Sequence, residues 1–343
     1  MKKISKTKIT QLDVARHAGV TRSMVSYVLN GKGRAVAPQT RKKILDAISE
    51  LGYRPNKFAR ALSMGKGGAL ADQHIGIVIS GAEMFLRPYY TEILAGIHSQ
   101  AHEKGFHIRF IRFFYELKDP VLFSQLIHSE EINGLLLVGI DQCLETDEDM
   151  RLIEKIKSQI DQIVCIDWQK TGLSSVLFDR QDAAFQAVNY LFLKGYEDIA
   201  YVGESDQRVT GFKQAFLEKG MKTSDHYIDS AMDMASGYEA VKRLHQKNNT
   251  LPRAVCCGSD EVAVGILLYL NEQNISVPGK TAVISIDNIE IAEYTNPQLT
   301  TVNVQKRAMG SCAVDMIVNR SAGSGENALS LLLPVSLVIR KSA

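Results

Sequence analysis

The fold of the N-terminal region is decided by two adjoining stretches, TQLDVARHAG at residues 10–19 and VTRSMVSYVLN at residues 20–30. Thr10 and Asp13 have the spacing of a capping box, in which two side chains satisfy backbone amides at the start of a helix. Gly19 follows that helix, and glycine permits the positive φ of a tight turn between two helices. The two stretches therefore predict a helix-turn-helix.

The second helix is expected to have one buried and one exposed face. Thr21 can cap its N-terminus. At 3.6 residues per turn its apolar residues share one side, and its polar residues point away from the core, as side chains that read a DNA groove must. A third helix, from about Pro38 to Leu51, is expected to complete the core. The buried side of the second helix comprises Val25, Val28 and Leu29, and the exposed side comprises Arg22, Ser23, Ser26 and Tyr27.

Basic residues are concentrated near the N-terminus. Residues 1–66 contain 15 Lys and Arg against 3 Asp and Glu, the remainder contains 25 basic and 35 acidic residues, and the whole chain carries a net charge of +2. Such an asymmetry is typical of a DNA-binding head on a neutral-to-acidic body. It argues against the alternative of a small helical bundle with no role in nucleic-acid binding.

Along its whole length the chain resembles the lactose-repressor/galactose-repressor family of bacterial transcription regulators. There are two departures: Tyr27 stands where the family often has an arginine that reads a guanine, and the turn at residues 31–36 is about one residue longer than usual. DNA binding remains the expectation, and the operator sequence stays open. The motifs that fall at the family's spacing are Asp13-Val-Ala, Ala18-Gly-Val, Val25-Ser26, Leu29-Asn30, Thr40-Arg41, Leu51-Gly-Tyr53 and Pro55-Asn56.

Two segments of the head are expected to contact DNA. In the second helix, Arg22 suits a bidentate contact with guanine, and Tyr27 suits a thymine methyl group. Residues 56–63 are expected to become a hinge helix only on DNA, because eight isolated residues do not offset the cost of helix nucleation. There, Leu62 would wedge between base pairs from the minor groove. The expected DNA-binding residues are Thr21, Arg22, Ser23, Ser26, Tyr27, Asn30, Arg41, Asn56, Lys57, Ala59 and Leu62.

The rest of the chain is expected to form an α/β body. Short apolar runs alternate with helical periods, which predicts parallel sheets covered on both faces, and a break near residues 177–179 divides them into two doubly wound lobes. Strands are expected at residues 75–80, 106–110, 134–138, 163–166, 199–202, 254–257 and 282–286, and helices at residues 90–105, 147–158, 182–194, 208–219, 235–247 and 260–273.

The resemblance implies that this body has the periplasmic-binding-protein type of fold, in which the chain crosses three times between lobes. The expected division is a head at residues 1–64, a Gly- and Ala-rich linker at 65–73, and an effector-binding and dimerisation domain at 74–343. The lobe near DNA would comprise residues of about 74–177 and 303–329, and the distal lobe residues of about 178–302 and 330–343.

Ligands of doubly wound sheets bind beyond the carboxyl ends of the strands. Asp167 and Trp168 follow one expected strand; a carboxylate accepts hydroxyls, and an indole offers a flat face to a sugar ring or a base. Arg208 matches the family's Arg-x-x-Gly-Phe motif, whose arginine forks onto effector oxygens, and Asp260 matches its effector-binding aspartate while also suiting a helix N-cap. Tyr89 and Tyr90 stand where the family often has aromatics. The alternatives are a core or hinge role for Trp168, a surface role for Arg208, and a core or rim role for the tyrosines.

Several other classes of site have little support. No Gly-x-Ser-x-Gly, P-loop or Gly-x-Gly-x-x-Gly motif follows an expected strand, so neither catalytic residues nor a cofactor are expected. His98 and His102 share a helix face but have no third metal ligand nearby, so no metal is expected. The five cysteines lack zinc spacing. With neither a signal peptide nor an apolar run of membrane-spanning length, we expect a cytoplasmic protein without membrane contact.

These observations favour a sequence-specific transcription regulator over an enzyme or a transport binding protein. It is expected to be a repressor of carbohydrate-metabolism genes that binds a pseudo-palindromic double-stranded operator as a homodimer. A tetramer is less favoured, because no segment follows Ala343 where a tetramerising tail would stand. The expected effector is a sugar or sugar phosphate, with a nucleobase second. Whether the effector induces or co-represses stays open.

Overall fold

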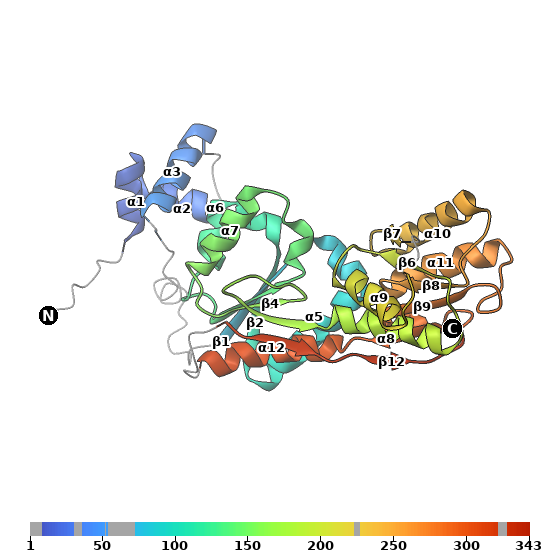
Figure 1. Ribbon diagram of the computed structural model, residues 1–343. Helices are drawn as coiled ribbons and strands as arrows, with labels where there is room; N and C mark the ends of the chain where they lie inside the picture. Colours follow the sequence, from blue (N-terminus) through green and yellow to red (C-terminus); the bar gives the residue numbers. More distant parts are fainter. Residues whose placement is uncertain (1–8, 31–35, 52, 54–72, 223–226, 322–327) are drawn as a thin grey trace. The chain divides into compact units, whose positions relative to one another are not determined.

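The computed structural model describes residues 9–30, 36–51, 53, 73–222, 227–321 and 328–343 (Figure 1). The chain divides into two compact units, and each is described by itself. The first unit comprises the residues up to Met84, Ile97–Ser175 and Ser311–Leu329, and the second comprises Phe85–Gly96, Val176–Gly310 and Ser330–Ala343. The expected hinge helix at 56–63, residues 65–72 of the expected linker and residues 31–35 of the long turn lie outside the described residues.

The head contains three helices, α1 (Gln11–Ala18), α2 (Arg22–Asn30) and α3 (Pro38–Leu51). The capping box is formed, since the amide of Thr10 donates to Asp13 Oδ2 (2.8 Å) and the amide of Asp13 donates to Thr10 Oγ1 (3.4 Å). Gly19 ends α1 with φ of 65°, which only glycine adopts without strain. The predicted helix-turn-helix is confirmed, with a core made of Val14, Ala15, Val25, Val28, Leu29, Ile44 and Ile48.

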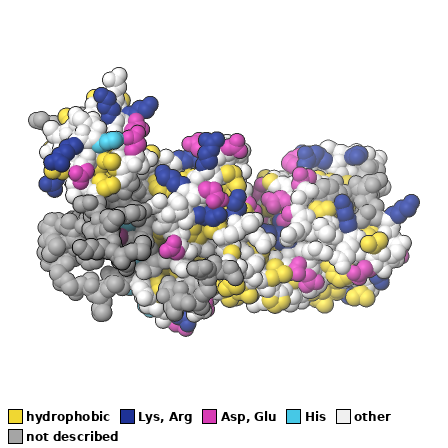
Figure 2. Space-filling model, turned by 60° about the vertical axis from the view of Figure 1, so that its left-hand side comes forward, with side chains coloured by type: hydrophobic (Ala, Val, Ile, Leu, Met, Phe, Trp, Pro, Cys, Tyr) yellow, Lys and Arg dark blue, Asp and Glu magenta, His cyan; other side chains and the backbone are white. Residues whose placement is uncertain are grey.

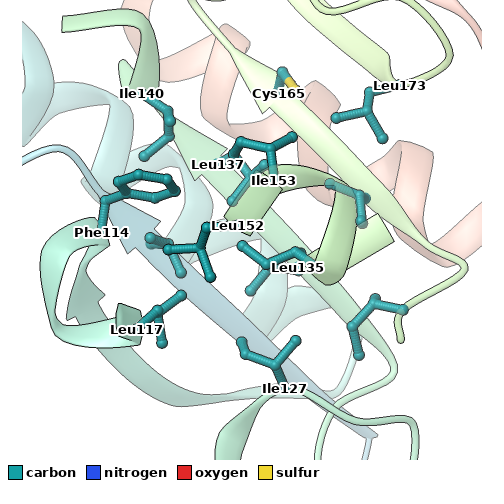
Figure 3. Packing of buried hydrophobic residues seen from close by; sticks show 14 of the residues in the cluster. Phe114, Leu117, Ile127, Leu135, Leu137, Ile140, Leu152, Ile153, Cys165 and Leu173 are labelled. Carbon is teal, nitrogen blue, oxygen red and sulfur yellow. The ribbon is translucent and has the colours of Figure 1, made fainter. Parts of the chain in front are cut away.

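The first sheet has six strands in the order β11-β5-β4-β3-β1-β2. All five residues of β3 (Gly134–Val138) are buried, as expected for a parallel strand covered on both faces. Figure 3 shows Leu135 and Leu137 of this strand packed near Ile153 of α7 and Phe114. Its other strands are β1 (Gln73–Ile79), β2 (Phe106–Phe113), β4 (Ile163–Ile166), β5 (Ser174–Phe178) and β11 (Ser330–Leu333), and the neighbouring helices in the chain are α5 (Pro88–Glu103), α6 (Pro120–Leu126), α7 (Asp147–Lys157) and α12 (Lys306–Ser321).

The second sheet also has six strands, in the order β12-β10-β9-β8-β6-β7. Neighbouring strands of this sheet pair in parallel except β10 with β12, which pair antiparallel. Only Pro334 and Val335 separate β11 from β12, although the two strands belong to different sheets. The strands are β6 (Ile199–Gly203), β7 (Tyr227–Asp229), β8 (Ala254–Cys257), β9 (Ala282–Asp287), β10 (Thr300–Asn303) and β12 (Ser336–Val338), and the helices are α8 (Arg180–Leu193), α9 (Gln207–Glu218), α10 (Met234–Asn248) and α11 (Asp260–Glu272).

The two doubly wound parallel-sheet bodies are confirmed, with two differences in detail. The expected break at residues 177–179 overlaps β5, and the compact units divide within that strand, between Ser175 and Val176. The sequence pattern missed β5, β7, β10, β11, β12 and α6, all of which have three to seven residues and are too short for a clear periodicity. Four 3-10 helices, at Ala82–Leu86, Phe114–Lys118, Ile140–Cys143 and Glu290–Glu293, complete the described elements.

In the described part of the chain, no helix is long and apolar enough to cross a membrane. Among those same residues, no group of three or more His, Cys, Asp or Glu side chains is placed to hold a metal ion.

Candidate DNA-binding surface and effector site

The outer face of α2 is polar and accessible. Arg22, Ser23 and Tyr27 are exposed, and Ser26 is half-buried. Val25 on the opposite face is completely buried, so packing against α1 and α3 fixes which side of α2 faces solvent. Several basic side chains of the head are prominent in Figure 2, and the exposed ones in the described residues include Arg16, Arg22, Arg41, Lys42 and Lys43.

The remaining expected DNA-binding residues are only partly described. Thr21 is exposed, and its hydroxyl accepts a hydrogen bond from the amide of Met24 (3.4 Å), which is the expected capping contact. Asn30 is the last residue of α2, and Arg41 is exposed on α3. Asn56, Lys57, Ala59 and Leu62 lie outside the described residues.

Arg208 is held at the carboxyl ends of β6 and β8 by a set of acceptors. Its Nε and Nη2 donate to the two oxygens of Asp206, the N-cap of α9, at 3.1 and 2.8 Å. Nη1 donates to the Gly258 carbonyl at 2.9 Å. Burial opposes the charge, but Tyr201 and Asp206 raise the pKa of Arg208 above its ordinary value. The guanidinium is therefore a fixed cation, and at 5% exposure it is not the surface arginine of the alternative.

Asp260 lies entirely inside the second unit. Its carboxylate accepts hydrogen bonds from Ser285 Oγ (2.5 Å), Thr301 Oγ1 (2.6 Å) and the amide of Ile289 (2.7 Å). Burial raises the pKa of Asp260 to about 6. The expectation that Asp260 caps α11 was wrong, because Ser259 occupies the N-cap and accepts from the amide of Val262. Asp260 instead joins α11 to β9, β10 and the turn after β9.

Asp287 is a candidate site residue that sequence reasoning missed. It ends β9 with φ of 118°, Asn288 follows with φ of 52°, and the Asp287 side chain is buried. Burial and the neighbouring Asp260 raise the pKa of Asp287 well above its ordinary value. Lys306, Arg208 and Arg87 act on that pKa in the opposite direction. The sequence did contain a signal for Asp287, because it directly follows the strand expected at residues 282–286, just as Asp167 follows the strand expected at residues 163–166.

Tyr89 and Tyr90 at the start of α5 pack within the second unit. Their rings meet edge to face at 5.0 Å, and both are buried, which fits the core alternative. Arg87, also missed from the sequence, stacks over Tyr90 at 5.4 Å from the ring centroid. Its Nε donates to Glu261 Oε2 at 3.0 Å.

Asp167 and Trp168 follow β4 in the first unit. Asp167 has φ of 61°, which turns the chain sharply at the strand end, and it is buried. Trp168 belongs to the hydrophobic core cluster of this unit, with 9% of its surface exposed. The structure thus brings Arg208, Asp260, Tyr89 and Tyr90 into one unit, and describes Asp167 and Trp168 separately in the other.

A helix-turn-helix joined to two doubly wound units with polar groups at their strand ends defines a class of protein: a DNA-binding regulator with a ligand-binding body. Family comparisons identify both parts. Residues 10–56 match the lacI family of bacterial regulatory proteins, and residues 188–343 match a periplasmic binding protein-like domain. The chain therefore combines the DNA-binding domain of the lacI family of bacterial regulatory proteins with a periplasmic binding protein-like domain.

Similar proteins extend over nearly the whole chain. The HTH-type transcriptional repressor PurR of Pasteurella multocida is 29% identical over 342 residues, covering 96% of this chain and 97% of that protein. PurR of Erwinia tasmaniensis is 29% identical over 341 residues, covering 96% and 95%. Among solved structures, the transcriptional regulator CelR with cellobiose has a TM-score of 0.69 at 24% identity, covering 98% and 100%. The lac repressor dimer bound to operator and an anti-inducer has a TM-score of 0.68 at 24% identity, covering 98% and 99%.

The protein is therefore a DNA-binding transcription regulator with a periplasmic binding protein-like domain. The helix-turn-helix domain also distinguishes it from a transport binding protein of similar fold.

Proposed function

We propose that the protein is a cytoplasmic repressor that binds a pseudo-palindromic double-stranded operator as a homodimer. The observation that carries this proposal is the exposed face of α2, with Arg22, Ser23 and Tyr27 above a buried Val25. One helix-turn-helix reads only a few base pairs, so specificity requires two heads related by a dyad. The lac repressor structure is described as a dimer on operator, which supports this assembly.

Within each head we assign base reading to Arg22, Ser23, Ser26 and Tyr27. Phosphate contacts are assigned to Thr21, Asn30 and Arg41. The residues assigned to the hinge helix in the minor groove are Asn56, Lys57, Ala59 and Leu62.

We further propose that the effector is a sugar or sugar phosphate, with a nucleobase as second candidate. Arg208 supplies a fixed guanidinium and Asp287 a carboxyl group, each beside a strand end of the second sheet, a combination that suits vicinal hydroxyls. Asp167 and Trp168, and Tyr89 and Tyr90, are kept as further candidate contacts of the ligand. Asp260 is assigned to the site as the support beneath Asp287. The CelR complex with cellobiose and a family member with ribose support the sugar class.

Residues of about 74–177 and 303–329 would form the lobe near DNA, and residues of about 178–302 and 330–343 the distal lobe. The compact units differ from these bounds, because Phe85–Gly96 and residues 303–310 belong to the second unit. On the division into compact units, the chain leaves the second unit after Gly310, within α12.

Two steps test these proposals. First, the full chain selects DNA from a random pool, and we expect two inverted half-sites; a single unrepeated site bound by monomer would contradict the dimer. Second, neutral sugars, sugar phosphates and nucleobases are screened for an increase in unfolding temperature, and each hit is tested for its effect on operator affinity. The Asp287→Asn variant should lose the response, whereas Asp161→Asn, an exposed carboxylate in the other unit, should keep it. If a ligand changed the operator affinity of Asp287→Asn as much as that of the wild type, Asp287 would not belong to the effector site.

A further inference from the structure

Lys306 occupies a position that is unfavourable for a lysine. It is the first residue of α12, where the helix dipole opposes a positive charge, and only 3% of its surface is exposed. Burying an ammonium group costs free energy unless its donors are satisfied. A residue that violates two local rules is expected to have a role beyond local stability.

The ammonium group of Lys306 is bound to the turn that carries Asp287. Its Nζ donates to the carbonyl oxygens of Asp287 (2.5 Å), Asn288 (3.2 Å) and Val304 (3.3 Å). Asp287 and Asn288 both have positive φ, a conformation that costs free energy for residues other than glycine. Three carbonyls gathered around one cation offset that cost. Asp260 holds the next residue of the turn through the amide of Ile289.

Lys306 also contacts α5. Its Nζ lies 3.6 Å from Glu92 Oε1. Here α5 and α12 pack closely, because a Cβ built at Gly96 would overlap the Arg307 carbonyl oxygen. Further along the pair, Gln100 Nε2 donates to Asp315 Oδ1 at 2.8 Å. Both helices begin in the second unit and continue into the first.

We propose that Lys306 is a positioning residue that holds Asp287 at the effector site and ties its turn, through Glu92, to the α5–α12 helix pair. A displacement of this turn then shifts the first residues of α5 and α12. Both helices continue into the first unit, which contains the head. This inference rests on the proposed effector site. It assigns to Lys306 and Glu92 a coupling role without ligand contact.

The test needs no effector. Lys306→Met keeps a side chain of similar length but removes the charge and all three donors. Arg307→Met is the matched control, because Arg307 is adjacent, 71% exposed in its side chain and also near Glu92 (3.8 Å). Glu92→Gln removes the ion pair with Lys306 by changing its other partner. Because Glu92 is half-exposed, we expect this variant to fold, so it remains informative even when Lys306→Met does not fold. Amide hydrogen exchange and affinity for the DNA selected by the full chain are measured for each variant.

We expect Lys306→Met to accelerate exchange at Asn288, Ile289 and the first turns of α5, and to change operator affinity roughly 2- to 30-fold, the range of residues that modulate coupling between sites. Glu92→Gln should shift operator affinity in the same direction, and the double variant should match the single ones. Arg307→Met should change neither measurement. Unchanged exchange at the turn, unchanged operator affinity in either variant, or additive effects in the double variant would overturn the proposal. Failure of the wild type to select any DNA would instead refute the proposed function, and exchange would still decide the role of Lys306.

Discussion

Asp260 and Asp287 show how two carboxylates close together take different roles. Asp260 is completely buried, and its carboxylate accepts hydrogen bonds from the hydroxyls of Ser285 and Thr301 and from the amide of Ile289. Asp287 has a positive φ at the end of β9, and Lys306, Arg208 and Arg87 act against the rise of its pKa. The first therefore supports the turn, and the second is the better candidate for binding a ligand.

The buried Asp260 makes stability depend on pH. Its pKa is about 6 in the folded protein against 3.8 as the reference value, so the folded state holds the proton more tightly. The free energy of unfolding should therefore rise as the pH falls from about 7 to about 5, by an amount on the order of 1–3 kcal/mol. Urea denaturation at a series of pH values measures this. Asp260→Asn should reduce the rise without abolishing it, because the raised pKa of Asp287 contributes in the same direction. Asp161→Asn should preserve the full rise; an equal rise in all three proteins would contradict the assignment.

Arg22 is expected to determine one base of each half-site. Arg22→Ala should reduce discrimination at a single base pair by about 1–3 kcal/mol, because one bidentate contact with guanine is lost. Binding to operator variants, each altered at one position, measures this preference. Arg41→Ala is the comparison and should weaken binding to all sequences alike. The same uniform loss in Arg22→Ala would make Arg22 a phosphate contact.

At the scale of elements, close helix packing depends on glycines that have no room for a side chain. A Cβ built at Gly211 of α9 would overlap the carbonyl oxygen of Gln181 in α8, which is backbone and cannot rotate away. Helix propensity alone would favour alanine at this position by nearly 1 kcal/mol. Packing and propensity therefore act in opposite directions.

We expect packing to dominate in Gly211→Ala. The α8–α9 pair must separate to admit the methyl group, so the free energy of unfolding should fall by about 1–3 kcal/mol. Thermal and urea denaturation measure the loss. Lys213→Ala, at an exposed position in the same helix, should stay within about 0.5 kcal/mol of wild type. A stabilised Gly211→Ala would show that the helices separate at little cost.

How much could be predicted from the sequence also depends on the element. The head was predictable because its signals are local: the capping box at Thr10, the turn at Gly19 and the apolar face of α2 lie within 20 residues of one another. Strands such as β3 were located as continuous apolar runs. By contrast, β7 and β12 have only three residues each, and they are strands because of the neighbours they pair with. The sequence placed Asp260 at a strand end but contained no information on the direction of its carboxylate, which partners 25 to 41 residues away determine.

At the scale of the whole molecule, a ligand-controlled regulator requires two affinities that depend on each other. Any effector that changes operator affinity by a given factor must have its own affinity changed by the same factor when DNA is bound. The charge distribution assigns the two functions to different regions, since residues 1–66 carry 15 of the 40 Lys and Arg. Variants at the effector site should therefore lower the affinity for the effector and leave the affinity for the operator, measured without effector, unchanged.

Arg208→Lys should show this separation. Lysine keeps the charge but not the fork that Asp206 and the proposed ligand use, so effector affinity should fall at least about tenfold. Operator affinity without effector should stay unchanged, because Arg208 is far from the head in the chain. Calorimetry with a hit from the ligand screen and operator titrations measure the two quantities. The control is Arg243→Lys, an exposed residue of α10; an equal loss there, or a loss of DNA binding in Arg208→Lys, would contradict the assignment.

The neighbouring strands β11 and β12 have a consequence for the order in which the protein is made. Ser330–Leu333 adds an edge strand to the first sheet, and Ser336–Val338 adds one to the second. A chain still growing on the ribosome has long since produced its helix-turn-helix, yet both sheets lack an edge strand until the same nine residues are translated. The three helices of the head can therefore form early in synthesis, whereas one short segment completes both sheets together.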